Sequence, residues 1–406
     1  MGKFTVQGGK ALIGSVRVSG SKNAALPIIF AAVTTRGVSR FYNLPDITDV
    51  TDALGIVKEL GAKIWREGEV TFVDTRELHY TAVNLDRVRR IRASTYLIGA
   101  CLARFKRAEL LPFGGCSFSH RPIDMHLAAA EKFGAEINEN HLKVKKLCPA
   151  DISFRVPSVG ATVNSLILAA STKGESRLIG AAREPHIRAL IEYLKSAGAE
   201  IFDKNGIITV HGADLHGGLA VMPGDMIEAG TFLTASIVTD GKVRVSGFDP
   251  RELSAFTSPL LSAGVIEELT DDGIMLLGRP RREISVTTGA YPAFATDLQP
   301  IFSTLLAISR GGRIEEEVWK SRFGYLDELS RLGLSYSRDG NSARIFKSNP
   351  LPGTATATDL RGGAAAVILA LAANGKSEIH SGELVLRGYD SFVEKLKSIG
   401  ADIFYE

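Results

Sequence analysis

The sequence predicts an α/β protein of two globular domains, each made of three copies of one unit. A short signature, a helix that ends in glycine and is followed by a strand, recurs six times at similar intervals along the 406 residues. Glycine is expected at the end of these helices because it adopts the left-handed C-cap conformation without a steric penalty. The glycines of the signature are Gly61, Gly134, Gly198, Gly264, Gly333 and Gly400.

Two short strands around a polar turn follow each of the first five glycines. Asn, Asp and Gly between alternating residues are typical of β-hairpins. The expected hairpins cover residues 62–73, 135–146, 199–212, 265–278 and 334–346. The sixth unit stops at Glu406 after one strand, so residues 3–20 are expected to complete it and to bring the chain ends into one domain.

Apolar helices lie between the hairpins. They are hydrophobic nearly all round, which predicts burial in a core; they cover residues 23–35, 160–173, 228–241, 296–312 and 358–375. A solenoid is the alternative for any repeat, but long units with buried helices favour closed domains. We expect one domain over 21–224, with boundaries near Ser21 and Gly224, and a second over 1–20 and 225–406.

Composition excludes few classes of protein. A net charge of +3 with 23% charged residues gives no argument for binding nucleic acid or an anionic membrane. Three widely spaced cysteines argue against a disulfide framework, and the apolar runs are too short for a membrane span. The N-terminus lacks the apolar core of a secretory signal. We expect a soluble cytoplasmic protein; its oligomeric state is not predicted.

The stretch Leu111–His126, LPFGGCSFSHRPIDMH, places Cys116 after two glycines in a loop. His120 and Arg121 follow, and nearby cations favour the reactive thiolate. A free cysteine is more often a small buried hydrophobic residue, and Cys101, within LIGACLARF, fits that description better. A reactive role for Cys116 is therefore one of two open interpretations.

Polar residues open several of the apolar helices, at Ser21-Lys22-Asn23, Ser158-Val159-Gly160, Thr296-Asp297 and Thr358-Asp359-Leu360-Arg361. Capping of free backbone N–H groups explains the Ser, Thr and Asp residues. It does not explain Lys22 or Arg361, because a cation opposes the helix dipole unless an anion shares the site.

Further arginines stand at Arg92, Arg121, Arg322 and Arg387. Singly each suits a solvated surface, but with Lys22 and Arg361 they would form a cationic site for phosphate and carboxylate groups. A carboxylate among them, Asp297, could act as a base. No zinc-ligand spacing, P-loop or dinucleotide fingerprint is present, and we expect no metal or redox cofactor.

Over essentially its whole length the sequence resembles the UDP-N-acetylglucosamine 1-carboxyvinyltransferases, enolpyruvyl transferases of the EPSP synthase superfamily. The matching stretches, in order, are GSKNAALPI, RAS, GGC with RPIDMH, SVGAT, AAREP, EAGTF, PAFATDLQ, SRF, ATDLR and RGY. The resemblance implies an inside-out α/β barrel of two domains with buried helices and outer sheets. It also implies transfer of enolpyruvate from phosphoenolpyruvate to the 3′-hydroxyl of UDP-N-acetylglucosamine, with release of phosphate, at the start of peptidoglycan synthesis.

The resemblance also assigns roles to residues. It implies that Cys116 is the general acid, open to alkylation by an epoxide of the fosfomycin type, and that Asp297 takes the proton of the sugar hydroxyl. The residues it places around phosphoenolpyruvate are Lys22, Arg121 and Arg387, with Arg322, Asp359 and Arg361 nearby. Those it places around the nucleotide sugar are Asn23, Arg92, Pro122, Ile123, Asp124, Met125, Ser158, Val159, Gly160, Asp297 and Val318.

The chain departs from the family pattern at Val156, where a lysine often contacts the nucleotide, and in the bulky Phe113, Phe118 and His120 of the cysteine loop. These departures concern the identity of the acceptor substrate and not the class of reaction. An enolpyruvyl transferase for another nucleotide or sugar is therefore a second interpretation, and a non-catalytic nucleotide-sugar-binding paralogue is a third. Cys116 together with Asp297 argues against the third, since a pure binding protein needs neither.

Overall fold

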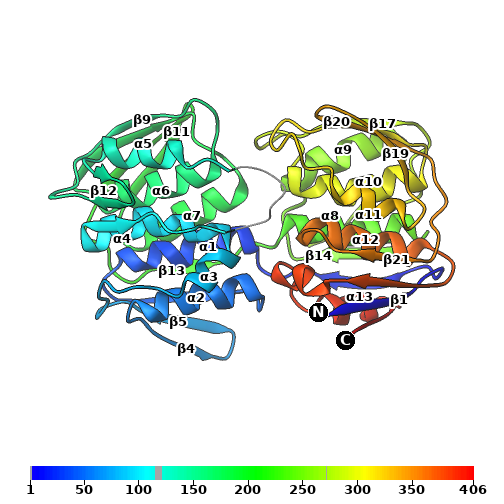
Figure 1. The fold of residues 1–406 in the computed structure, drawn as a ribbon, viewed down its shortest axis with the longest axis horizontal. Coiled ribbons are helices and arrows are strands. Elements are labelled where there is room, and N and C mark those ends of the chain that lie inside the picture. The colour runs from blue at the N-terminus through cyan, green and yellow to red at the C-terminus, as the bar shows by residue number, and fades with distance from the viewer. Residues whose placement is uncertain (1, 115–120, 271) are drawn as a thin grey trace. The chain divides into compact units, whose positions relative to one another are not determined.

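The computed structural model describes residues 2–114, 121–270 and 272–406. These residues cluster into two compact units (Figure 1). The central unit comprises residues 20–114 and 121–223, and the terminal unit comprises residues 2–19 and 224–406 apart from residue 271. The chain passes from one unit to the other at Ser19–Gly20 and at Pro223–Gly224.

Three helices of the central unit are almost wholly buried: α1 (Lys22–Ala31), α4 (Leu97–Phe105) and α6 (Val159–Ala170). Helix α4 contacts both α1 and α6. The Ala, Leu and Ile side chains on every face of these helices are shielded from water. Burial of each Leu or Ile side chain contributes about 1.5–3 kcal/mol. The other helices of this unit are α2 (Thr48–Glu59), α3 (Leu85–Arg90), α5 (Asp124–Lys132), α7 (Pro185–Ser196), η1 (Ala32–Thr34) and η2 (Arg92–Tyr96).

Three sheets belong to the central unit, and their strand orders are β13-β3-β5-β4, β11-β12-β10-β9 and β6-β8-β7. The strands are β3 (Val38–Tyr42), β4 (Lys63–Glu67), β5 (Val70–Asp74), β6 (Arg107–Glu109), β7 (Glu136–Asn138), β8 (His141–Lys143), β9 (Asp151–Ser153), β10 (Gly174–Ile179), β11 (Glu200–Lys204), β12 (Ile207–Gly212) and β13 (Leu219–Val221). In the four-stranded sheets the hairpin strands pair antiparallel and the edge strand β9 or β13 pairs parallel.

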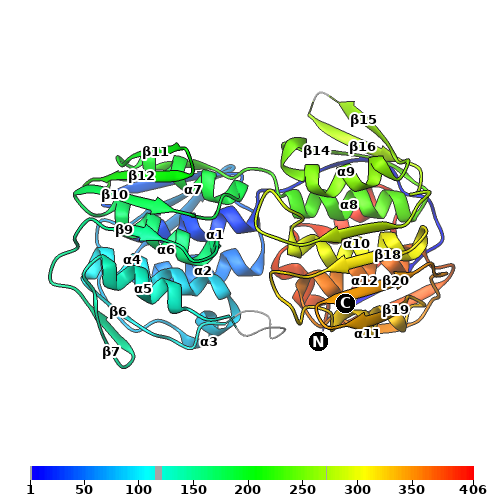
Figure 2. The same ribbon diagram turned by 90° about the horizontal axis from the view of Figure 1, so that it is seen from above.

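The terminal unit repeats this design. Its buried helices α8 (Met226–Val238), α10 (Gln299–Ile308) and α12 (Leu360–Ala372) all contact one another (Figure 2). Its other helices are α9 (Ser254–Ser262), α11 (Tyr325–Ser330), α13 (Phe392–Ser398), η3 (Pro250–Leu253), η4 (Thr296–Leu298) and η5 (Gly382–Arg387). Among the helices that the structure describes, none combines the length and the apolar character that a membrane span requires.

The sheets of the terminal unit have the orders β15-β16-β14-β2, β17-β18-β20-β19 and β21-β22-β1-β23. Their strands are β1 (Lys3–Gln7), β2 (Ile13–Arg17), β14 (Lys242–Ser246), β15 (Ile266–Thr270), β16 (Gly273–Leu277), β17 (Ile284–Thr287), β18 (Gly312–Glu315), β19 (Ser335–Asp339), β20 (Ser342–Phe346), β21 (Thr354–Thr356), β22 (Lys376–His380) and β23 (Asp402–Tyr405). The N-terminal strand β1 lies between β22 and β23 and pairs antiparallel with both. It therefore fills the place that the second hairpin strand holds in the other units.

The predicted α/β repeat with buried helices is confirmed. All six signature glycines have positive φ, between 89° and 113°, as a left-handed helix end requires. Each of the five predicted hairpins is present as an antiparallel pair. The repeat places three helix N-termini, those of α1, α4 and α6, in the central unit and three, those of α8, α10 and α12, in the terminal unit. The candidate site residues lie at or near several of these N-termini.

Candidate active site

Asp297 binds two buried arginines in the terminal unit. It lies in η4, directly before α10, and its Oδ1 accepts a hydrogen bond from Nη1 of Arg322 at 2.8 Å. Its Oδ2 accepts one from Nε of Arg361 at 3.2 Å. The two arginine side chains are 4% and 2% exposed, whereas the Asp297 side chain is 29% exposed. Two guanidinium groups on one carboxylate favour its ionised form.

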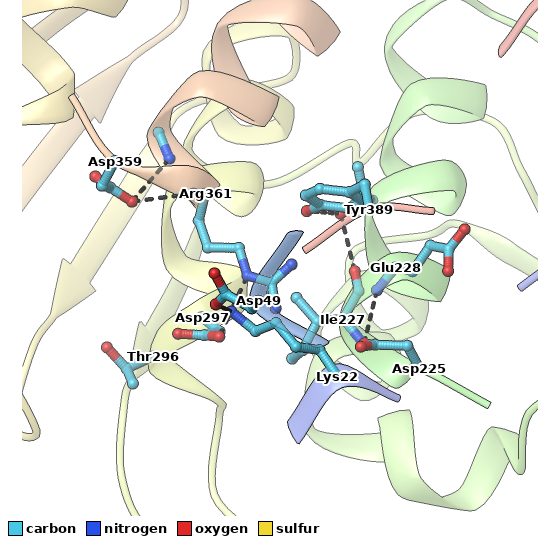
Figure 3. A network of polar contacts seen from close by, with 12 residues as sticks. Lys22, Asp49, Asp225, Ile227, Glu228, Thr296, Asp297, Asp359, Arg361 and Tyr389 are labelled. Atoms are coloured by element: carbon cyan, nitrogen blue, oxygen red, sulfur yellow. Dashed lines mark hydrogen bonds and ion pairs between the residues drawn. The ribbon is translucent and has the colours of Figure 1, made fainter. Parts of the chain in front are cut away.

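Arg361 contacts Asp297 and the N-cap of its own helix (Figure 3), but its guanidinium is not fully hydrogen-bonded within the described residues. It lies in the first turn of α12, where Oδ1 of the N-cap residue Asp359 accepts the backbone N–H groups of Arg361 and Gly362 at 3.0 and 3.2 Å. The guanidinium carbon stands 5.1 Å from the centroid of the Tyr389 ring. Its Nη1 and Nη2 are buried and have no hydrogen-bond partner among the described residues. Buried donors in this state are suited to a ligand oxygen.

Arg322 precedes α11 and is the second buried cation. Burial acts to lower its pKa, but the negative charges of Asp297 and Asp359 outweigh that effect and raise the pKa above its usual value. Its Nη1 also donates to Thr296 Oγ1 at 3.1 Å. Asp297, Arg322, Asp359 and Arg361, four of the residues predicted from the sequence, therefore belong to one polar network. Arg387 ends η5, two residues before Tyr389, and is half-buried.

Lys22 begins α1 in the central unit, and the structure corrects the sequence-based account of it. We expected this cation to need an anionic ligand. Its Nζ instead lies 3.3 Å from Oδ2 of Asp49 on α2, and the Asp49 side chain is 5% exposed (Figure 3). The neighbouring Asn23 is half-buried, and Ser21 makes no side-chain cap. Lys22 thus has a carboxylate partner within its own unit, which offsets the unfavourable helix dipole.

The expectation that Thr296 and Asp297 cap a helix is also wrong. The N-cap of η4 is Ala295, and α10, which follows, has no side-chain cap. Ser158 and Asp359 do cap their helices: Ser158 Oγ accepts the backbone N–H of Ala161 at 3.4 Å. Polar residues at a helix start therefore divide into caps and residues that bind side chains from distant segments.

Arg92 and the segment from Arg121 onward lie together in the central unit. Nη2 of Arg92 donates to the carbonyl oxygen of Arg121 at 2.5 Å. Burial and the charge of Arg121 lower the pKa of Arg92. Pro122 and Ile123 lead into α5, which starts at Asp124. The structure therefore brings Arg92, predicted to bind the nucleotide sugar, against Arg121, predicted to bind phosphoenolpyruvate. Cys116, the predicted general acid, lies outside the described residues.

His126 on α5 was missed by the sequence analysis, although it ends the RPIDMH stretch. Its ring lies against the first turn of α6, because a Cβ on Gly160 would come within 2.7 Å of the ring atoms Cε1 and Nε2. Its Nδ1 lies 2.7 Å from Nδ2 of Asn164, which also donates to the Thr95 carbonyl. Burial, and then the charge of Arg92, lowers the pKa of His126 to about 4. The imidazole is therefore neutral at physiological pH.

We expect His126 to make the protein less stable in acid. Its pKa of about 4 lies below the ordinary 6.5, so the unfolded chain binds more protons between these values. Stability is then complete above about pH 6.5 and falls by roughly 3 kcal/mol as the pH drops to about 4. In urea unfolding at several pH values, the difference in unfolding free energy between the native protein and His126→Gln should show this slope, since other buried groups such as Glu228, whose pKa burial raises to about 7, are common to both. An equal slope in His126→Gln, with the exposed His141→Gln as control, would contradict the assignment.

Comparison with known proteins places these features in a family. The model of the family EPSP synthase (3-phosphoshikimate 1-carboxyvinyltransferase) matches residues 6–396. UDP-N-acetylglucosamine 1-carboxyvinyltransferase 3 of Caldanaerobacter subterraneus subsp. tengcongensis is 39% identical, and the match covers 99% of each chain. UDP-N-acetylglucosamine 1-carboxyvinyltransferase of Trichlorobacter lovleyi is 38% identical, with 99% of each chain covered.

Two solved structures are also similar. The enolpyruvyl transferase NikO from Streptomyces tendae has a TM-score of 0.89 and 27% identity, with 100% of this chain and 99% of that chain covered. EPSP synthase from Acinetobacter baumannii has a TM-score of 0.71 and 15% identity, with 100% of both chains covered. The second likeness shows the fold alone.

Proposed function

We propose that this chain, which belongs to the EPSP synthase family, transfers the enolpyruvyl group of phosphoenolpyruvate to the 3′-hydroxyl of UDP-N-acetylglucosamine and releases phosphate. The observation that carries the proposal is full-length similarity, at 39% and 38% identity, to relatives named for this acceptor. The polar network around Asp297 supports it, since both substrates are anions and the network presents buried cationic donors. The expected cytoplasmic location stays a prediction.

The reaction needs an acid, a base and neutralisation of charge. Protonation of C3 of phosphoenolpyruvate, by Cys116 in this proposal, makes C2 an electrophile of oxocarbenium character. The sugar hydroxyl then attacks C2 and gives its proton to Asp297. Loss of a proton from C3 expels phosphate and regenerates the enol ether. Most of the catalytic effect in such a scheme comes from positioning and electrostatics.

Its two ion pairs hold Asp297 in place for proton transfer. Oδ1 and Oδ2 each accept a hydrogen bond from a guanidinium group, and each carboxylate oxygen has a second lone pair that can accept the hydroxyl proton. The hydroxyl becomes acidic as its oxygen forms the new C–O bond. Proton removal and attack are therefore expected to be concerted.

Phosphoenolpyruvate requires several cations in this scheme. The resemblance assigns Lys22, Arg121 and Arg387 to it, and the buried arginines Arg322 and Arg361 supply further cationic donors. The Lys22–Asp49 pair gives the first of these a defined position before any ligand binds. A substrate anion would then replace or share the carboxylate partner, which makes Lys22 both a binding group and a group whose partner changes.

The resemblance assigns further residues to the nucleotide sugar. Ser158 is the N-cap of α6, whose first residues are Val159 and Gly160, and the free N–H groups of a helix N-terminus bind phosphate. Arg92 and the segment 121–125 lie in the same unit and add positive charge and apolar contact. Asn23, Asp297 and Val318 are assigned to the sugar.

Phosphate release from phosphoenolpyruvate, measured with a panel of nucleotide sugars, tests the proposal. We expect release to depend on UDP-N-acetylglucosamine and the product to carry an enolpyruvyl ether at the 3′ position by NMR. Turnover with a different acceptor only would contradict the acceptor and retain the reaction class. Binding of the nucleotide sugar without any phosphate release would contradict the reaction and favour a non-catalytic binding protein.

A further inference from the structure

Glu316 is a fully buried carboxylate to which the proposed reaction gives no role. It follows β18 directly and has 0% exposure. Its Oε1 accepts the backbone N–H groups of Val318 and Trp319 at 2.9 and 2.8 Å. Its Oε2 accepts the hydroxyl of Thr296 at 2.8 Å. One side chain thus fixes the backbone of the 317–319 loop and a residue of η4, which are distant in the sequence.

Thr296 transmits this contact to Arg322. A hydroxyl has one proton, and the carboxylate of Glu316 can only accept it. The oxygen of Thr296 is then left to accept Nη1 of Arg322, at 3.1 Å. The same Nη1 donates to Asp297 at 2.8 Å. In this series from Glu316 through Thr296 and Arg322 to Asp297, the donor and the acceptor of each hydrogen bond are therefore fixed by the chemistry of the side chains.

This series of hydrogen bonds connects two residues that are assigned to the acceptor sugar, Val318 and Asp297. Val318 is bound through its backbone N–H, and Asp297 is bound through Thr296 and Arg322. A change in the position of Glu316 would move both, because its two oxygens act on the two segments separately. Burying a carboxylate is costly unless it is hydrogen-bonded and near a cation. Three hydrogen bonds and the charge of Arg322 offset that cost here.

We propose that Glu316 is a positioning residue for the acceptor: it holds the Val318–Trp319 backbone and the Asp297–Arg322 pair in one arrangement. It acts through Thr296 and the loop and does not itself contact a substrate. This inference rests on the proposed function of the site. A purely structural role would affect stability alone, and the experiment below separates the two roles.

Thr296→Val and Glu316→Gln test the chain of hydrogen bonds. Valine removes only the hydroxyl, and glutamine cannot accept on both sides as the carboxylate does. In each variant kcat/KM for the acceptor is expected to fall by about 10- to 100-fold, as for a small misplacement of reacting groups. Thr296→Ser keeps the hydroxyl and is therefore expected to retain most of the native kcat/KM for the acceptor.

Ser303→Ala is the matched control, since it also removes a hydroxyl of the terminal unit, one bound at 2.7 Å to the hydroxyl of Tyr325. It is expected to lower the melting temperature and to keep kcat/KM for the acceptor. The inference would be overturned if Thr296→Val and Glu316→Gln behaved as Ser303→Ala does.

Trp319 gives a second measurement that needs no substrate. The sequence has two tryptophans, and Trp65→Phe in the central unit leaves Trp319 as the sole tryptophan, whose fluorescence is excited selectively over that of tyrosine. In that background, Glu316→Gln is expected to increase quenching of Trp319 by acrylamide, because the loop loses its acceptor. Unchanged quenching would overturn the inference. If the native protein failed to release phosphate, the proposed function would fail, while the quenching would still decide whether Glu316 fixes the loop.

Discussion

Asp297→Asn is expected to lower kcat by about 10²- to 10⁴-fold, the usual contribution of a general base. The amide has the shape of the carboxylate but cannot accept a proton near neutral pH. It also carries no charge, so Arg322 and Arg361 lose their shared counter-ion. The melting temperature is therefore expected to fall as well, although Asp297 is 29% exposed and solvent weakens the loss. Binding of the nucleotide sugar to the variant should be retained in calorimetry.

Asp52→Asn provides the matched control for this variant. Asp52, on α2, is 5% exposed and binds Arg87 and Arg90 at 3.1 and 2.7 Å, so it is also a carboxylate between two guanidinium groups. Its replacement is expected to lower the melting temperature and to keep kcat. A comparable loss of kcat in both variants would attribute the effect to stability. Retention of most activity in Asp297→Asn would remove Asp297 from the role of base.

The repeat could be predicted from the sequence because its signals are local. A glycine such as Gly333 marks the end of its own helix, and the turn residues of each hairpin lie between the strands that they join. The place of β1 followed from a count of missing strands in the last unit. These features need no knowledge of contacts between distant segments.

The partners of charged residues could not be predicted in the same way. The carboxylate partner of Lys22, Asp49, lies on a different helix, and no residue near Lys22 in the sequence indicates this contact. For Asp297 the sequence allowed both a cap and a carboxylate among the arginines, and the contact with Arg361 that decides between them joins two distant segments. Only a tertiary contact decides between a cap and an ion pair, since Asp suits both.

Residues without a local pattern were missed for a related reason. Glu316 lies in the run Glu315–Glu317, where a solvated position is the ordinary expectation, and its burial depends on donors from η4 and the following loop. His126 was part of a quoted motif, yet its neutral state comes from packing against α6. Buried polar groups of this kind are specified by the fold as a whole.

Arg361→Met is expected to reduce kcat/KM for phosphoenolpyruvate by about 10²- to 10³-fold, as removal of a preorganised donor does, without lowering the melting temperature. The reason is that only one of the three guanidinium nitrogens of Arg361 donates a hydrogen bond within the described residues. Nε binds Asp297, but Nη1 and Nη2 are buried without a partner among the described residues, so the free protein bears their desolvation cost. Methionine of similar length would remove that cost, and this gain opposes the loss of the ion pair with Asp297, whose partly exposed carboxylate keeps Arg322 as a counter-ion.

Arg104→Met is the contrasting variant. Arg104 donates from Nη1 to the Thr35 carbonyl and from Nη2 to the Thr75 carbonyl, both at 2.8 Å, so its guanidinium satisfies groups of the fold. Its loss is expected to lower the melting temperature and to leave kcat/KM unchanged. Activity assays and thermal unfolding of the two variants should therefore give opposite patterns. An Arg361→Met variant with a lowered melting temperature and an unchanged kcat/KM would show that the guanidinium serves the fold. Loss of a donor that binds a substrate is expected to lower kcat/KM and to leave the melting temperature unchanged.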